Sequence, residues 1–134
     1  MRYTSEIKIN FHHADPAGIM YFANIFTFAH VIFEEFIQAA GFTWADWFQK
    51  PKLIVPIRHT QCNYLSPLYA GQTYEVSVRV SALKETSFTV EYVFSKDSKC
   101  HANVTMTHVY VDPNDGKKAT IPTADRERLK QFAS

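Results

Sequence analysis

The chain has 134 residues and a mass of 15.4 kDa, which suits one domain of ordinary size. Hydrophobic residues make up 46% and charged residues 20%, a balance that predicts a sizeable core and excludes a wholly disordered chain. The formal net charge is only +1 and no basic stripe stands out, which argues against nucleic acid as the main partner.

Nothing in the sequence predicts a membrane segment, a disulfide framework or a bound cofactor. Residues 1–8 lack the basic and then apolar pattern of a signal peptide, and polar side chains interrupt the most apolar stretch, residues 17–42. Cys62 and Cys100 are predicted to be reduced thiols, and no His, Cys and Asp spacing matches a known metal motif. We therefore expect a cytoplasmic protein without a metal ion.

The N-terminal third predicts one strand and one long helix. Apolar and polar residues alternate over residues 3–11, which is typical of a strand. Its inward face is predicted to carry Ile7, Ile9 and Phe11. After a polar loop, apolar residues at helical spacing predict a helix over residues 20–40. This helix is apolar almost all round, so we expect it to be covered on most sides.

The rest of the chain is mostly strand-like. Residues 43–49 predict a short amphipathic helix, and residues 53–65 predict a long extended segment. Pro56 within that segment indicates an edge position or a bulge. Three alternating segments joined by short polar turns then predict antiparallel neighbours, over residues 74–82, 88–94 and 102–110. Residues 123–132 predict a terminal amphipathic helix.

The order of these elements indicates the α+β class, in one domain over residues 1–134. We expect an antiparallel five-stranded sheet wrapped around one long central helix. The outer face of the sheet is expected to carry apolar residues such as Ile54, Val93 and Val109. Because one small domain does not cover both faces, we expect the chain to pair with a second copy.

The segment Asp15-Pro16-Ala17-Gly18 stands just before the predicted helix and could carry chemistry. Proline and glycine favour a tight turn, and the first amides of a helix have no internal hydrogen-bond partner. Such amides can hold a developing oxyanion while Asp15 attacks a carbonyl or activates water. The alternative is that Asp15 only caps the helix or the turn.

Residues 10–24 read NFHHADPAGIMYFAN and resemble the acyl-CoA thioesterases of the hotdog-fold superfamily, above all the 4-hydroxybenzoyl-CoA thioesterase group. The resemblance continues through residues 55–59 and 64–72, and resumes at residues 87–88 and at the tail from Ile121. It implies a hotdog fold and the hydrolysis of an aromatic or short-chain acyl-CoA to free acid and CoA. It also implies a homodimer or a homotetramer.

The resemblance implies roles for residues of this loop. Asp15 resembles the catalytic carboxylate of the family, and the backbone N–H of Phe22 resembles the donor to the thioester carbonyl. Tyr21 is a candidate pocket residue. A carboxylate is a weak base at neutral pH but a competent nucleophile, which favours attack by Asp15 to give a mixed anhydride. Base catalysis by Asp15 through a water molecule stays open.

His30 lies where the hydroxybenzoyl enzymes carry a carboxylate that contacts the ring hydroxyl, which argues against 4-hydroxybenzoyl-CoA itself. Together with Glu34 it resembles the His-x-x-x-Glu pattern of 1,4-dihydroxy-2-naphthoyl-CoA thioesterases. An imidazole at this position could form a hydrogen bond with the acyl group. The alternative is a core histidine that Glu34 or a backbone carbonyl satisfies.

Two further residues are candidates with simple structural alternatives. His59 could approach the site across a subunit interface, or it could be an ordinary sheet residue. Lys84 could bind the phosphates of CoA, because the hydroxybenzoyl enzymes carry basic residues before the equivalent Ser-Phe pair. A solvated turn lysine is the alternative.

Competing functions are a non-catalytic acyl-CoA or acyl-carrier binding protein and a dehydratase of the same fold. A cysteine hydrolase is not expected, because Cys100 and His101 are adjacent in an extended segment and point to opposite faces. The chain contains no Gly-x-Ser-x-Gly sequence, which argues against an α/β-hydrolase.

Overall fold

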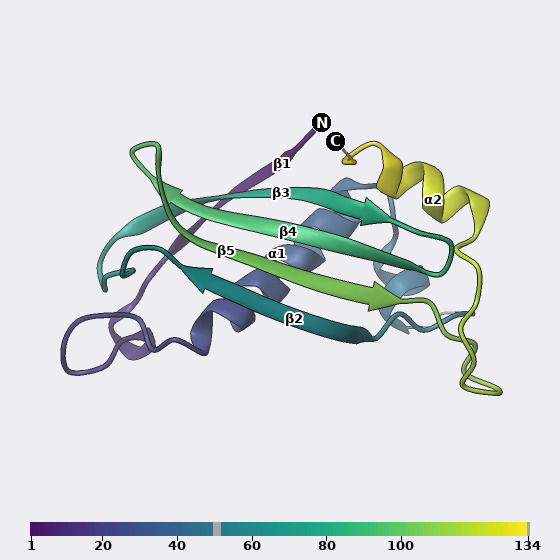
Figure 1. The fold of residues 1–134 in the computed structure, drawn as a ribbon, viewed down its shortest axis with the longest axis horizontal. Helices are drawn as coiled ribbons and strands as arrows, with labels where there is room; N and C mark the ends of the chain where they lie inside the picture. Colours follow the sequence, from purple (N-terminus) through teal and green to yellow (C-terminus); the bar gives the residue numbers. More distant parts are fainter. Residues whose placement is uncertain (50–51, 134) are drawn as a thin grey trace.

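A computed structural model describes residues 1–49 and 52–133 of the chain. Five strands form one antiparallel sheet in the order β1-β3-β4-β5-β2 (Figure 1). The strands are β1 (Tyr3–Lys8), β2 (Ile57–Tyr64), β3 (Thr73–Leu83), β4 (Ser87–Lys96) and β5 (Lys99–Val109). The helical elements are a 3₁₀ turn η1 (Phe11–His13), α1 (Asn24–Ala39), a π-helical turn η2 (Ala45–Gln49) and α2 (Thr123–Lys130). Within the described ranges, no helix is long and apolar enough to cross a membrane.

The predicted alternation of β3, β4 and β5 is confirmed by their burial. Every second residue of β3 from Tyr74 to Val80 is buried, and the pairing places Val80 opposite Val90 of β4. Val90 in turn lies opposite Met106 of β5. Because side chains alternate between the two faces of a strand, these residues form a continuous apolar surface on one side of the sheet.

The prediction from Pro56 is also confirmed. Strand β2 lies at one edge of the sheet and pairs only with β5. Its register shifts between Ile57 and His59, directly after the proline. All residues of β2 except Cys62 are exposed. The outer edge of β2 therefore presents unpaired backbone groups to the surroundings.

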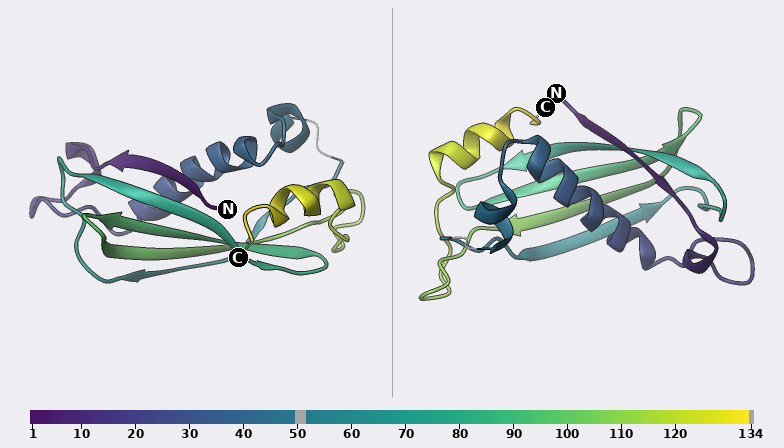
Figure 2. Two further views of the ribbon diagram at one scale, coloured as in Figure 1. Left: turned by 90° about the horizontal axis from the view of Figure 1, so that it is seen from above. Right: turned by 180° about the vertical axis from the view of Figure 1, so that it is seen from behind.

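Helix α1 lies diagonally across the apolar face of the sheet (Figure 2). Its buried side chains are Ile25, Ala29, Ile32, Phe33, Phe36 and Ile37. Each fully buried large apolar side chain contributes about 1.5–3 kcal/mol to stability. The predicted start at residue 20 is wrong, because the N–H of Met20 donates to the carbonyl of Leu68 and Ile19 pairs with Tyr69. These contacts hold residues 19–20 in extended backbone, and α1 begins only at Asn24.

The predicted long central helix, covered on most sides by the sheet, is not confirmed. Helix α1 has 16 residues and contacts the sheet along one side. Val31 on its other side is 54% exposed, and Phe22, just before the helix, is 62% exposed. Phe11 was predicted to point inward with Ile7 and Ile9, but it is 92% exposed because the strand ends before it. The exposed apolar surface therefore gathers around the start of α1.

The outer face of the sheet is more polar than predicted. Arg79 and Glu91 form an ion pair of 2.6 Å across β3 and β4, and Asn103 donates to Glu91 at 3.0 Å. Burial alone would raise the pKa of Glu91, but the hydrogen bonds from Asn103 and Arg79 lower it. Val109, predicted to be exposed there, is buried. The β2 edge, and not this face, is therefore the surface of the sheet that lacks a cover.

Candidate active site

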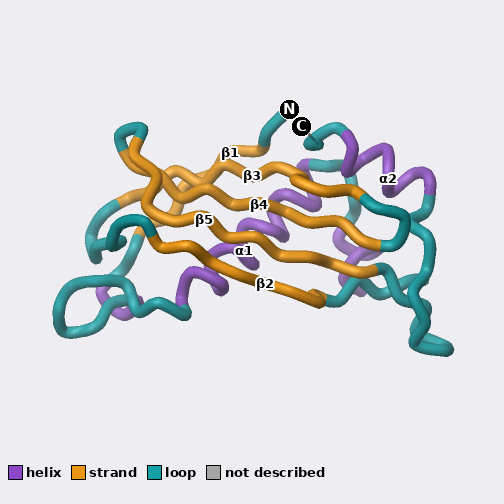
Figure 3. The backbone as a smooth tube through the Cα atoms, in the orientation of Figure 1, coloured by secondary structure: helices purple, strands orange, loops and turns teal. Residues whose placement is uncertain are grey.

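The Asp15 loop forms a tight turn that projects beyond the end of the sheet (Figure 3). The N–H of Asp15 donates to the Ile19 carbonyl at 3.0 Å, and the N–H of Gly18 donates to the Asp15 carbonyl at 2.9 Å. Gly18 has φ of +78°, a left-handed conformation that glycine adopts without strain. Oδ1 of Asp15 accepts from the N–H of Ala17 at 2.8 Å. Asp15 therefore caps its own turn and not α1.

The carboxylate of Asp15 is exposed, and only one of its oxygens has a partner among the described residues. An exposed aspartate within a rigid turn keeps one oxygen free for another contact. In the single chain, however, none of the hollows described below includes Asp15 in its lining. A second surface must cover this loop before Asp15 lies in a closed site.

The backbone before α1 presents two consecutive amides, those of Phe22 and Ala23, without an acceptor among the described residues. The N–H of Tyr21 donates to the His13 carbonyl at 2.8 Å, and the N–H of Asn24 donates to the Tyr21 carbonyl at 3.0 Å. The N–H of Phe22, between them, has no acceptor among the described residues. Donors at the start of a helix lack internal partners and favour a negatively charged or polarised oxygen. The Phe22 amide is thus able to hold a carbonyl oxygen.

An apolar hollow of about 330 Å³ lies beside Phe22. It is lined by Ile19, Met20, Phe22 and residues 64–68. The hydroxyl of Tyr64 donates to the Phe22 carbonyl and so fixes the peptide on one side of the hollow. Burial raises the pKa of Tyr64, and nearby Cys62 raises it further, so the phenol stays protonated and remains a donor.

His30 and Glu34 lie one turn apart on the open side of α1. His30 is exposed and Glu34 is half-buried, and no hydrogen bond joins them in the described structure. The buried histidine satisfied by Glu34, which was the alternative, is therefore not observed. The ring of His30 lies parallel to that of Phe33, with centroids 5.9 Å apart. His30 and Glu34 line a shallow hollow of about 340 Å³ together with Phe26, Thr27 and Val31.

His59 and Lys84 do not join Asp15 within one chain. His59 is exposed on the β2 edge, where its Nε2 lies 3.4 Å from Oε1 of Gln61. Lys84 lies just beyond the C-terminal end of the 11-residue strand β3, whereas the Asp15 loop lies at the other end (Figure 1). Such a strand is roughly 35 Å long, so Lys84 does not reach a ligand held by Asp15 of the same chain.

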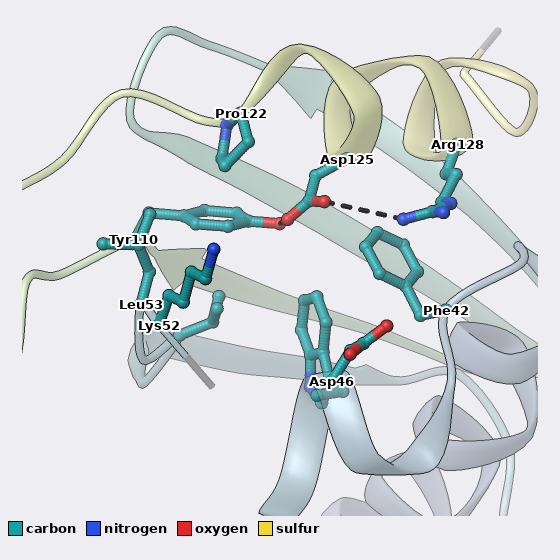
Figure 4. A pocket seen from close by; sticks show the side chains of 10 residues that line it. Phe42, Asp46, Lys52, Leu53, Tyr110, Pro122, Asp125 and Arg128 are labelled. Carbon is teal, nitrogen blue, oxygen red and sulfur yellow. Dashed lines mark hydrogen bonds and ion pairs between the residues drawn. The ribbon is translucent and has the colours of Figure 1, made fainter. Parts of the chain in front are cut away.

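A separate hollow of about 300 Å³ lies between α2, η2 and the end of α1 (Figure 4). Three of its polar side chains already have partners: the hydroxyl of Tyr110 donates to Asp125 at 2.9 Å, and Arg128 lies 3.7 Å from Asp125. The Arg128 guanidinium also lies 5.2 Å from the centre of the Phe42 ring. This hollow is at the far end of the molecule from the Asp15 loop, and its contacts are those of helix docking.

Sequence reasoning missed His108, which is only 1% exposed and lies between the rings of Phe33 and Phe88. The sequence did carry a signal. His108 occupies an inward position of the alternating segment 102–110, where a titratable side chain needs a partner or a ligand. Elsewhere, no cluster of three or more His, Cys, Asp or Glu residues able to hold a metal ion occurs in residues 1–49 and 52–133.

Comparisons with known proteins agree on one family. The family model described as the thioesterase-like superfamily matches residues 9–129. A 1,4-dihydroxy-2-naphthoyl-CoA hydrolase of Crocosphaera subtropica is 28% identical over 125 residues, which cover 91% of each chain. The same enzyme of Synechococcus elongatus is 28% identical over 131 residues, covering 97% of this chain and 93% of its own. A solved 1,4-dihydroxy-2-naphthoyl-CoA thioesterase from Synechocystis shares the fold, with a TM-score of 0.88 at 18% identity and 98% coverage of both chains.

Proposed function

The chain belongs to the thioesterase-like superfamily and is a thioester hydrolase, and we propose that its substrate is an aromatic acyl-CoA and that Asp15 carries the chemistry. The free Phe22 amide, close in sequence to the rigid Asp15 turn and beside an apolar hollow, is the observation that carries this proposal. The chain covers most of the length of its hydrolase relatives, and we treat residues 1–134 as one catalytic domain.

The proposed reaction begins with the thioester carbonyl oxygen accepting a hydrogen bond from the Phe22 N–H. This bond strengthens as the oxygen becomes negative, which lowers the barrier to attack on the carbonyl carbon. The Asp15 carboxylate attacks that carbon, the C–S bond breaks, and CoA leaves as a thiolate. Water then cleaves the resulting anhydride, releasing the acid and restoring Asp15. In the alternative, Asp15 takes a proton from the water that attacks directly.

An aromatic acyl group is favoured over a short aliphatic one for two reasons. The hydrolase relatives named above act on a naphthoyl thioester. In addition, Tyr21 and Phe22 are large exposed aromatics before α1, with ring centroids 5.0 Å apart. Exposed aromatic side chains around an apolar hollow are suited to a planar ring. His30 and Glu34 line other hollows of the same chain, so we propose that they provide the polar contact of this ring from the partner subunit.

A homodimer through the β2 edges would complete the site. Two copies of an exposed edge strand can pair antiparallel about a two-fold axis and so satisfy their free backbone groups. Such pairing places the Ile57 end of one β2 beside the Tyr64 end of the other. It would also bring His59 near the Phe22 hollow of the partner. Lys84 stays a candidate for CoA phosphates only through a partner subunit, because it is remote from its own Asp15.

Sedimentation equilibrium tests the assembly. We expect a mass of two or four times 15.4 kDa at micromolar concentration, because the β2 edge and the exposed aromatics around Phe22 need a cover. A monomer at all concentrations that still hydrolyses substrate would contradict the shared site. A dimer that persists with the β2 amides open to hydrogen exchange would contradict this particular interface.

A thiol-release assay over aromatic, short-chain and long-chain acyl-CoA substrates tests the function itself. We expect turnover to be fastest with the aromatic substrates, including 1,4-dihydroxy-2-naphthoyl-CoA. Equal or faster turnover of long-chain substrates would contradict the aromatic preference. Saturable binding of acyl-CoA without thiol release over the whole panel would instead favour a non-catalytic acyl-CoA binding protein.

A further inference from the structure

His108 is held in an unusual position for a titratable side chain. It lies at the end of β5 facing α1, with its ring parallel to Phe33 at 4.4 Å and to Phe88 at 5.0 Å between centroids. The interplanar angles are 10° and 7°, so the three rings form a stack. This stack fixes the plane of the imidazole and the directions in which its two nitrogens point.

Neither ring nitrogen of His108 has a hydrogen-bond partner within the described part of the chain. A neutral imidazole carries one donor and one acceptor, and leaving a buried polar group unpaired costs about 1–3 kcal/mol. Burial lowers the pKa of His108 to about 4, and the charge of His30 adds to this shift. The Val55 backbone opposes it as a hydrogen-bond acceptor for the protonated ring, although it forms no hydrogen bond of good geometry with the imidazole. The side chain is therefore neutral at pH 7 and offers both hydrogen-bonding functions.

The unpaired imidazole lines a hollow that is otherwise mostly apolar and aromatic. This hollow measures about 430 Å³, within the usual range for small-molecule sites. Its other lining residues are His30, Phe33, Trp47, Phe48 and residues 54–57. These walls suit a planar apolar ligand. Both His108 nitrogens are covered in the ligand-free chain, so a lining side chain has to move before a ligand hydroxyl supplies the donor and acceptor that the imidazole lacks.

We propose that His108 is a specificity-determining residue that forms a hydrogen bond with a ring hydroxyl of the aromatic acyl group. This inference rests on the proposed function and on the paired β2 edges. Residues 54–57 flank the hollow, and in such a dimer the Ile57 end of one β2 lies beside the Tyr64 end of the other. The ring pocket of one subunit would therefore adjoin the Phe22 amide of its partner, and His30 would stand at the entrance.

The test compares two acids that differ only in their hydroxyl groups, 1,4-dihydroxy-2-naphthoic acid and 2-naphthoic acid. Calorimetry on the intact wild-type protein should give about tenfold tighter binding of the hydroxylated acid, the effect of about one good hydrogen bond. His108→Phe keeps the ring stack but removes both nitrogens, so it should bind the two acids equally. If His108→Phe does not fold, His108→Leu replaces it, since it also removes both nitrogens and should bind the two acids equally.

Tyr92→Phe is the matched control. Its hydroxyl is also buried, without a partner among residues 1–49 and 52–133, and Tyr92 lies on the same face of the sheet but lines none of the described hollows. This variant should keep the wild-type preference. A preference retained in His108→Phe, lost equally in Tyr92→Phe, or absent from the wild type would overturn the proposal.

The two CoA thioesters of these acids separate this inference from the proposed function. In the wild type, kcat/KM should favour the hydroxylated thioester, and in His108→Phe the ratio of the two kcat/KM values should fall to about one. If neither thioester is hydrolysed, the proposed function fails, whereas the binding comparison of the free acids still decides the role of His108.

Discussion

Replacing Asp15 by Asn should lower kcat/KM for thioester hydrolysis by about 10²- to 10⁴-fold, the usual contribution of a catalytic acid, base or nucleophile. An asparagine Oδ1 can still accept the hydrogen bond from the Ala17 N–H, so the turn should keep its shape. The amide, however, neither attacks a carbonyl nor takes a proton from water at neutral pH. Thiol release under kcat/KM conditions gives the comparison, and circular dichroism and sedimentation check the fold and the assembly.

Asp115→Asn is the matched control for this prediction. Oδ1 of Asp115 accepts from the N–H of Lys117 at 2.9 Å, which is the same local contact that Asp15 makes. Both side chains are exposed, but the Asp115 turn is far in the fold from the Asp15 loop. The control should retain wild-type turnover. Turnover within a few-fold of wild type in Asp15→Asn would leave Asp15 with the role of a turn cap alone.

The parts of the fold that the sequence predicts well are those in which burial has a simple period. Strands β3, β4 and β5 each have one buried face, so alternation places them within a few residues. The sequence does not predict the first residue of α1, because the apolar side chains of Ile19 and Met20 are compatible with a helix and with an extended segment alike. Their backbone bonds to residues 68–69, remote in sequence, decide between the two.

In the candidate site too, local features are predictable from the sequence, whereas features that depend on tertiary contacts are not. The Asp15 turn is local, so Pro16 and Gly18 predict it directly, and the family resemblance supplies its role. The exposure of Phe22 depends on where α1 begins, and that start is a tertiary effect. His108 is part of the predicted alternation of its segment, but a single histidine at an inward position does not by itself indicate a binding role. Only the structure shows that its nitrogens lack partners and that it lines a hollow.

Acid should weaken the fold through His108 in a defined pH window. The imidazole has an ordinary pKa of 6.5 in the unfolded chain, and burial lowers the pKa of His108 to about 4 in the fold. Between these values the unfolded state binds the proton more strongly, so the free energy of unfolding falls as pH falls from 6.5 to 4. At 1.36 kcal/mol per pKa unit, the full loss is about 3 kcal/mol, and no more is lost through this residue below pH 4.

Urea denaturation at a fixed protein concentration, repeated between pH 7.5 and 4, measures this loss. His108→Phe should remove about 3 kcal/mol of the pH dependence, whereas Tyr92→Phe should not change it, because burial raises the pKa of Tyr92 and the phenol stays protonated throughout.

Other titratable groups contribute to the pH dependence as well. Burial lowers the pKa of His13, with His12 adding to the effect, so both variants should keep the smaller loss of unfolding free energy that His13 causes in acid. The lowered pKa of Glu91 affects stability only below its ordinary value of 4.5. Equal slopes for the wild type and His108→Phe would mean that His108 titrates normally, and its nitrogens would then have to reach water or a partner in solution.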